Sequence, residues 1–268
     1  MKKIIAVLFC MYCFAGKAQT IDTFIDVSSH KLHFHIIKGN NSPILFESGN
    51  GDDASVWNPL LDQIHTSTGA TLITYDRAGL GKSGIDTLHI SFKNEIKDLE
   101  KALKKLGYAK NLFFVSHSFG GFYSSLYTYR NKKKVKGAVF IDVATPCFFT
   151  TDWAKNFTDS IKTEDWNMIK QYKLGLYYVL SNFKNISAYM NDKYLSSATP
   201  ATLIIAENIL PLVKKEEQAK WTDCLRAFGT MPNHQYVVAK DAEHKVWEKQ
   251  PQLVIDEIVK LYKQVSVK

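Results

Sequence analysis

The stretch that most constrains the fold is residues 112–123, which read LFFVSHSFGGFY. It opens with an apolar run, Leu112 to Val115, of the kind that forms a buried strand. Ser118 follows this run, and a helical pattern begins at Phe122 and continues to Arg130. A strand that turns directly into a helix, with a serine at the tip, is the context that a nucleophile elbow requires. The sequence therefore predicts that Ser118 presents its Oγ at the end of a buried strand.

The residues around Ser118 suit such a turn. Gly120 and Gly121 predict a close approach between the new helix and the strands. The N–H of Phe119 is placed at the helix N-terminus, where the positive end of the dipole favours an oxyanion. The usual pattern is G-x-S-x-G, and Ser116 stands at its first position. Serine is small enough for the turn, and a Ser/Gly-rich turn without chemistry is the alternative interpretation.

The remaining chain alternates strand and helix patterns, as expected for an α/β domain. The predicted strands are 21–27, 31–37, 43–47, 71–75, 112–115, 135–143, 201–206 and 235–239. The predicted helices are 54–68, 92–106, 122–130, 211–228 and 251–265. Residues 145–199 interrupt this alternation with a helix-rich, aromatic segment. We expect 145–199 to form an inserted helical cap, with 19–144 and 200–268 forming the core.

The N-terminus has the pattern of a signal peptide. Basic residues Lys2 and Lys3 precede an apolar run, Ile4 to Phe14, that is too short to span a bilayer comfortably. Gly16 and Ala18 are the small residues that a signal peptidase reads. We therefore predict cleavage after Ala18, a secreted or periplasmic protein and no stable membrane anchor, with a retained N-terminal anchor as the alternative.

Charge and cysteine content bear on the partners of the protein and on its cross-links. The net charge is +8, but no basic stripe with interleaved aromatic residues is present, so nucleic acid is not an expected partner. Cys147 and Cys224 are the cysteines that lie beyond residue 18. We predict that both are buried thiols; a disulfide, which an oxidising compartment would permit, is the alternative. The sequence gives no oligomeric state.

Two loops follow predicted strands. The loop at residues 48–53 follows strand 43–47, and the backbone N–H of Asn50 there is a candidate second oxyanion donor. The loop at 76–84 contains Gly81-Lys82-Ser83, which resembles part of a phosphate-binding loop. Such a loop requires a glycine where this chain has Asp76, so that interpretation is excluded. We predict instead a turn braced by the side chains of Asp76 and Arg77.

A serine nucleophile needs a base, and the base needs an acid that orients it. The chain has eight histidines, and His117 is expected to be buried in the elbow itself. His244 alone is in a loop just after the last predicted strand, at the sheet edge where Ser118 is also expected. His244 is therefore the candidate base.

With these motifs in this order, the chain resembles the α/β-hydrolase superfamily. The elbow (116–121), the oxyanion loop (47–51), the turn at 76–83 and the histidine loop (241–244) are similar to that family's motifs, although Glu243 stands where glycine is common. The resemblance implies a mostly parallel central sheet with helices on both faces. The family most often places its acid after the strand at 201–206, where this chain has Glu207 but no aspartate. Some members place it after the strand before the cap, where Asp142 stands, and we favour Asp142 over Glu207.

The resemblance implies a serine hydrolase that acts by acyl transfer on a small-molecule substrate. In this interpretation Ser118 attacks, His244 is the base, Asp142 orients it, and the N–H groups of Phe119 and Asn50 bind the oxyanion. No metal or organic cofactor is implied. The family's dehalogenases and epoxide hydrolases use aspartate as the nucleophile, so they fit less well. The aromatic cap favours an ester, or a small amide, with an apolar portion. The alternative is a binding protein that keeps the scaffold without the chemistry.

Overall fold

The computed structural model describes residues 19–266. The signal peptide predicted for residues 1–18 lies outside this range. The strands are β1 (Thr20–Asp26), β2 (Lys31–Ile37), β3 (Asn41–Glu47), β4 (Ala70–Tyr75), β5 (Leu112–His117), β6 (Val135–Ile141), β7 (Ala201–Ala206) and β8 (His234–Ala239). They form one eight-stranded sheet in the order β1-β2-β4-β3-β5-β6-β7-β8. Pairing is antiparallel for β1–β2 and β2–β4 and parallel for the rest, so the prediction of a mostly parallel sheet is confirmed.

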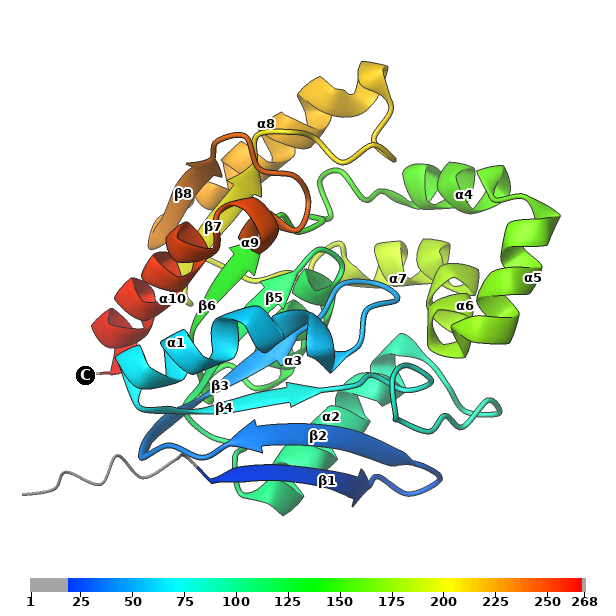
Figure 1. The fold of residues 1–268 in the computed structure, drawn as a ribbon. Coiled ribbons are helices and arrows are strands. Elements are labelled where there is room, and N and C mark those ends of the chain that lie inside the picture. The colour runs from blue at the N-terminus through cyan, green and yellow to red at the C-terminus, as the bar shows by residue number, and fades with distance from the viewer. Residues whose placement is uncertain (1–18, 267–268) are drawn as a thin grey trace, which may run out of the picture.

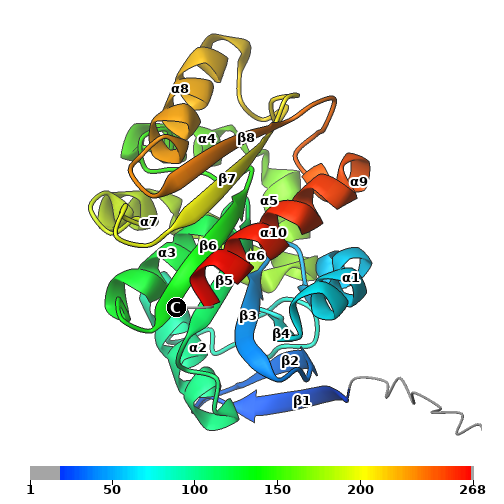
Figure 2. The ribbon, with the colours of Figure 1, turned by 90° about the vertical axis from the view of Figure 1, so that its left-hand side faces the viewer.

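Helices cover both faces of the sheet (Figures 1 and 2). The helices of the α/β core are α1 (Asn58–Thr68), α2 (Phe92–Leu106), α3 (Gly120–Arg130), α8 (Gln218–Gly229), α9 (Val246–Lys249) and α10 (Pro251–Ser266). In β5, Phe114 packs into the core beneath α2 and α3, whereas Phe113 and Val115 pack into the core beneath α1 and α10. Every residue of β5 is buried, which is the pattern of a parallel strand covered on both faces.

The predicted ends of α2 agree with the structure, whereas two other predicted helices begin later than expected. Helix α2 begins after Ser91, whose side chain accepts from the N–H of Asn94, and ends at Gly107 in the left-handed conformation. The helix predicted at 54–68 is instead a 3-10 turn (Ala54–Trp57) followed by α1. The predicted start of the helix at 211–228 was also wrong. Residues 215–217 form a short 3-10 turn, and α8 begins only at Gln218. Residues 210–213 form a turn that places Leu210 and Leu212 against a cavity described below.

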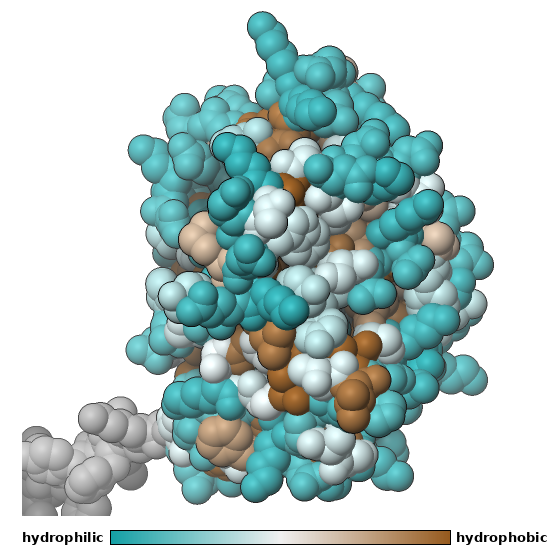
Figure 3. Space-filling view, turned by 90° about the vertical axis from the view of Figure 1, so that its right-hand side faces the viewer, coloured by the Kyte–Doolittle hydropathy of each residue, from teal (hydrophilic) through white to brown (hydrophobic). Residues whose placement is uncertain are grey.

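Four helices between β6 and β7 lie beyond the strand ends (Figure 1). They are α4 (Thr151–Ser160), α5 (Thr163–Tyr172), α6 (Leu174–Ser181) and α7 (Phe183–Met190). A hydrogen bond between two backbones joins these helices to the core: the N–H of Gly175 donates to Gly79 O at 3.1 Å. A Cβ on Gly175 would lie 2.2 Å from Ala78 O, so no larger residue fits this contact without a shift. The outer face of this region is largely hydrophilic, with smaller groups of hydrophobic side chains (Figure 3). Within residues 19–266, no helix is both long and apolar enough to span a bilayer.

The prediction of two buried thiols was wrong. Cys147 and Cys224 form a disulfide with a Cα–Cα separation of 5.5 Å. Cys147 is exposed in the segment after β6, and Cys224 is buried in α8. The pairing depends on how the segment after β6 packs against α8, since 77 positions separate the two cysteines along the chain. Spacing alone could not reveal this contact.

We predict that the disulfide stabilises the fold. A cross-link over 77 positions restricts the unfolded chain and is worth at most about 4.5 kcal/mol in the loop-entropy model. Denaturant unfolding with and without a reductant should therefore show a lower midpoint for the reduced protein. The Cys147→Ser/Cys224→Ser double variant should match the reduced protein and no longer respond to reductant. An unchanged midpoint on reduction would contradict the prediction.

Candidate active site

Ser118 lies at the tip of the turn between β5 and α3. Its φ is +53°, in the left-handed region that non-glycine residues seldom adopt. Its N–H donates to Ile141 O of β6 at 3.1 Å, which holds the turn against the sheet. Gly120 permits the crossing, because a Cβ there would lie 2.5 Å from Glu47 O of β3. Ser116, the departure from the usual motif, is fully buried and donates from Oγ to Ser124 Oγ at 2.8 Å.

The structure brings Ser118, His244 and Asp142 together. His244 Nε2 lies 2.9 Å from Ser118 Oγ, and His244 Nδ1 lies 2.6 Å from Asp142 Oδ2. Asp142 is 1% exposed, and its other oxygen accepts the N–H of Ala206 at 3.2 Å. The carboxylate accepts the Nδ1 proton, so Nε2 is left as the acceptor for the serine hydroxyl. This arrangement meets the geometric requirements of a nucleophile, a base and an orienting acid.

Glu207, the alternative acid, has a different contact. Its Oε2 accepts the N–H of Asp241 at 2.8 Å, at the start of the loop that carries His244. Glu207 therefore holds the histidine loop by its backbone, and Asp142 is the acid that contacts the imidazole. Glu243, which stands where glycine is common, is exposed and is accommodated without a packing conflict.

The two predicted oxyanion donors flank the nucleophile. Phe119 follows Ser118 at the N-terminus of α3, and Asn50 is in the loop after β3. Within residues 19–266, neither backbone N–H donates to another group of the protein. The loop approaches Ser118 closely, because a Cβ on Gly49 would lie 3.3 Å from Ser118 Cβ. Both N–H groups are thus free to bind an incoming oxygen.

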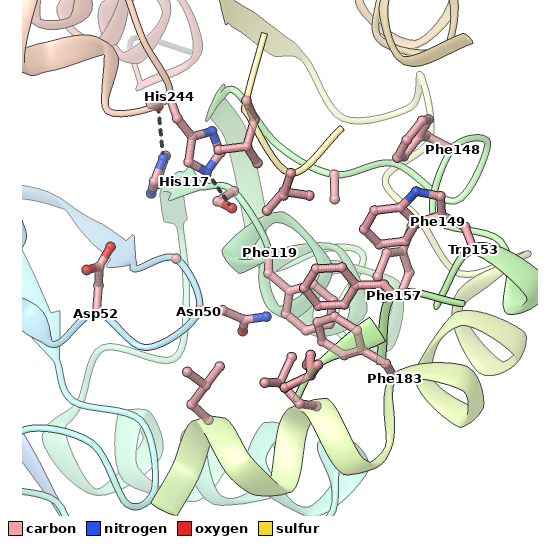
Figure 4. Close-up of a pocket in the computed structure, with 18 of the residues that line it drawn as sticks. Asn50, Asp52, His117, Phe119, Phe148, Phe149, Trp153, Phe157, Phe183 and His244 are labelled. Carbon is pink, nitrogen blue, oxygen red and sulfur yellow. Dashed lines mark hydrogen bonds between the residues drawn. The ribbon is translucent and has the colours of Figure 1, made fainter. Parts of the chain in front are cut away.

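His117 has a positioning contact that the sequence did not reveal. It is 1% exposed, as expected, and its Nε2 lies 3.0 Å from the backbone oxygen of His244. Burial, with a smaller effect of neighbouring His244, holds the pKa of His117 well below its usual value. The ring is therefore neutral, donates from Nε2 and fixes the main chain of the candidate base. Figure 4 shows His117 and His244 side by side at the edge of the cavity.

The turn at residues 76–84 is braced as predicted. Asp76 accepts the N–H groups of Ala54 and Lys82, both at 2.8 Å. Arg77 is 4% exposed and donates to Glu47 Oε1 at 2.9 Å. It also donates to the backbone oxygens of the loop that carries Asn50, as described further below.

A cavity of about 660 Å³ opens beside Ser118. Much of its wall is aromatic: the ring of Phe119 packs against Phe149 and Phe183, with centroids 5.5 and 5.1 Å away, and Trp153 and Phe157 extend the same cluster (Figure 4). Polar groups stand beside the apolar wall: Asp52 and Lys245 line the cavity and form an ion pair at 3.1 Å. Across residues 19–266, no group of three or more His, Cys, Asp or Glu side chains is arranged to hold a metal ion.

Comparison with known proteins agrees with the fold. The model of the α/β-hydrolase fold family matches residues 42–160, from β3 through α4. An uncharacterized protein of Bacillus subtilis, YqjL, is 34% identical over 129 residues, a segment that is 48% of each chain. The chain thus matches only about half the length of that relative.

Solved structures match over nearly the whole chain. The haloalkane dehalogenase DatA from Agrobacterium tumefaciens is 14% identical with a TM-score of 0.63, over 92% of this chain and 97% of that one. A thermophilic esterase from Thermogutta terrifontis is 16% identical with a TM-score of 0.62, over 93% of this chain and 100% of that one. This chain therefore has the α/β-hydrolase fold. At these identities the structural matches establish the fold alone.

Glu95 of α2 should make stability depend on pH. Burial raises its pKa to about 7, although Arg77 and a 2.8 Å hydrogen bond from Tyr123 oppose the shift. The native state therefore binds more protons than the unfolded state between about pH 4.5 and 7. Over that window the free energy of unfolding should fall as pH rises, by at most about 1.4 kcal/mol per pH unit.

The measurement is denaturant unfolding from pH 4.5 to 8 for the wild type and Glu95→Gln. The difference between their free energies of unfolding should grow with pH, because glutamine cannot ionise but can still accept the hydrogen bond from Tyr123. Glu100→Gln, on the same helix, is the control: although burial acts to raise the pKa of Glu100, hydrogen bonds from Arg130 and Asn131 outweigh it and lower that pKa, so its difference from the wild type should be flat above about pH 5.5. Parallel curves for the wild type and Glu95→Gln would contradict the prediction.

Proposed function

We propose that this protein is a serine hydrolase that cleaves a carboxylic ester, or a small amide, with an apolar portion. The observation that carries the proposal is the hydrogen-bonded series Asp142–His244–Ser118 beside an aromatic cavity. The dehalogenase and the esterase share the fold, so the fold does not select the reaction. The side chain at the elbow selects the reaction, and in this chain it is Ser118, with His244 beside it as the base.

The proposed mechanism is acyl transfer. Ser118 Oγ attacks the substrate carbonyl carbon while His244 Nε2 takes the hydroxyl proton. The N–H groups of Phe119 and Asn50 bind the oxyanion of the tetrahedral intermediate. His244 then returns the proton to the leaving alcohol or amine, and an acyl group remains on Ser118. Water, deprotonated by His244, attacks the acyl group and releases the carboxylic acid.

The cavity supports a substrate with an apolar portion. Its aromatic wall offers little to hydrogen-bond, so desolvated alkyl or aryl groups bind there favourably. Its polar groups include Ser118, His244 and the Asp52–Lys245 pair at one side, with Ser160 and Asp165 on the helices between β6 and β7. The ester carbonyl is therefore expected beside Ser118, with the apolar portion against the rings of Phe149, Phe157 and Phe183.

We further propose that residues 1–18 are a cleaved export signal and that the protein acts in an oxidising compartment. The disulfide between Cys147 and Cys224 supports this, because such bonds persist mainly outside reducing cytoplasm. N-terminal sequencing of the protein recovered from the producing cells tests it. A first residue of Gln19 is expected, and a retained Met1 would contradict it.

Ser118 is predicted to react with a fluorophosphonate probe. Activated serines form a stable phosphonyl adduct with such probes, and peptide mass spectrometry locates the modified residue. Labelling of the wild type at Ser118 is expected, with none in Ser118→Ala and a large loss in His244→Ala. The exposed His89→Ala variant is the control and should label like the wild type.

The same samples are assayed on p-nitrophenyl esters of increasing acyl length. Turnover that disappears in Ser118→Ala would support the proposal. A folded wild type that neither labels nor turns over any ester or amide would overturn it and favour a binding protein.

Asp142 and Glu207 should differ sharply on substitution. Asp142→Asn keeps the shape but cannot hold His244 in the required tautomer, so kcat should fall by about 10³- to 10⁴-fold. Glu207→Gln still offers an oxygen to the Asp241 N–H, so kcat should stay near the wild-type value. Steady-state kinetics on one ester compares the two. The reverse order of effects would transfer the acid role to Glu207.

A further inference from the structure

The loop after β3 is held from below by one buried cation. Arg77 Nη1 donates to Ser48 O at 2.5 Å, and Nη2 donates to Gly49 O at 2.6 Å. Arg77 thus binds two successive carbonyls of the segment that presents Asn50. Asn50 and Gly49 line the cavity, whereas Arg77 is not among the described residues that do so. Arg77 is 4% exposed, so its guanidinium reaches the loop from the buried core and not from the cavity.

Peptide geometry converts this contact into an orientation of the Asn50 N–H. All described peptide bonds are trans, so the C=O of Gly49 and the N–H of Asn50 point in opposite directions. Because Arg77 holds Gly49 O on the buried side, the Asn50 N–H points to the side of Ser118. Withdrawal of electron density from the bonded carbonyl also makes that N–H a better donor.

The guanidinium is itself fixed on several sides. Glu47 is fully buried; its Oε1 accepts from Arg77 and its Oε2 accepts from Tyr75 OH at 2.6 Å. The Tyr123 ring lies against the other side, with Arg77 Cζ 4.6 Å from its centroid. A planar fork with two fixed donors can hold two carbonyls at once, which a lysine ammonium on a flexible stem cannot.

We propose that Arg77 is a positioning residue for catalysis: by clamping the carbonyls of Ser48 and Gly49 it aims the Asn50 N–H at the developing oxyanion. This inference rests on the proposed function of Ser118. Arg77 touches no substrate and acts only through the loop. Its contribution therefore appears in the transition state and not in ground-state binding.

The test compares Arg77→Lys with Arg130→Lys. Arg130 also pairs with a glutamate, Glu100, but at the surface and far from the cavity, so it is the matched control. With p-nitrophenyl butyrate, Arg77→Lys should lower kcat by about ten- to a hundredfold, part of the effect of losing one oxyanion donor. KM should change little. Arg130→Lys should match the wild type in both constants.

Two further readouts separate positioning from a merely structural effect. Butylboronic acid, which forms a tetrahedral adduct with an activated serine, should bind Arg77→Lys more weakly by about the same factor as kcat falls. The pH at half-maximal kcat/KM should not move, because the His244–Asp142 pair is untouched. If Arg77→Lys instead lost the same factor in kcat/KM through a raised KM, with kcat and boronate affinity unchanged, the proposal would be overturned.

A second variant covers the case in which Arg77→Lys does not fold. Glu47→Gln/Arg77→Met removes both charges, so no unpaired ion remains buried. If it folds, as circular dichroism would show, kcat should still fall because the carbonyl clamp is lost. Wild-type kcat in either folded variant overturns the inference and leaves the proposed function intact. A folded wild type without labelling or turnover overturns both.

Discussion

The buried pair of Glu47 and Arg77 is the interaction on which the rest of the candidate site depends. It joins the end of β3 to the turn after β4 and satisfies the loop carbonyls of Ser48 and Gly49. Two charges removed from water cost several kcal/mol each unless their hydrogen-bonding capacity is filled. Here Tyr75 and the loop backbone fill most of it. The pair thereby anchors the glycine-containing loop that forms one wall of the cavity.

Three of the six non-glycine residues with positive φ among residues 19–266 lie at the same edge of the sheet as the candidate site. Ser118, Asp142 and Asp241 all have positive φ, at 53°, 44° and 55°. Each stands at or near the carboxyl end of a parallel strand, where the chain must turn sharply away from the sheet. Ladder-like hydrogen bonds, such as Asp142 N–H to Ile204 O at 2.7 Å, hold these residues in place. Such conformations are unfavourable by about 1–3 kcal/mol each, and the packing of the strands beneath them offsets this free energy.

The helices between β6 and β7 complete the cavity and are fastened to the core at several points. Gly175 contacts Gly79, Lys173 Nζ donates to Gly51 O at 2.6 Å, and the disulfide links Cys147 to α8. The Lys173 contact falls on the same loop that Arg77 holds from below. The loop after β3 is therefore held both by the core and by the helices between β6 and β7, so a movement of those helices would disturb the loop.

The sequence by itself determined the sheet, the serine at the strand–helix turn and the histidine after the last strand. These follow from local patterns: apolar runs, small residues at a turn, and chain order. Only the tertiary structure decided between Asp142 and Glu207, because both follow strands that end at the same edge. It alone paired Cys147 with Cys224, joined His117 to the backbone of His244 and turned Arg77 toward Gly49 O. Each of these contacts joins segments far apart in the chain, and their meeting depends on strand order and helix packing.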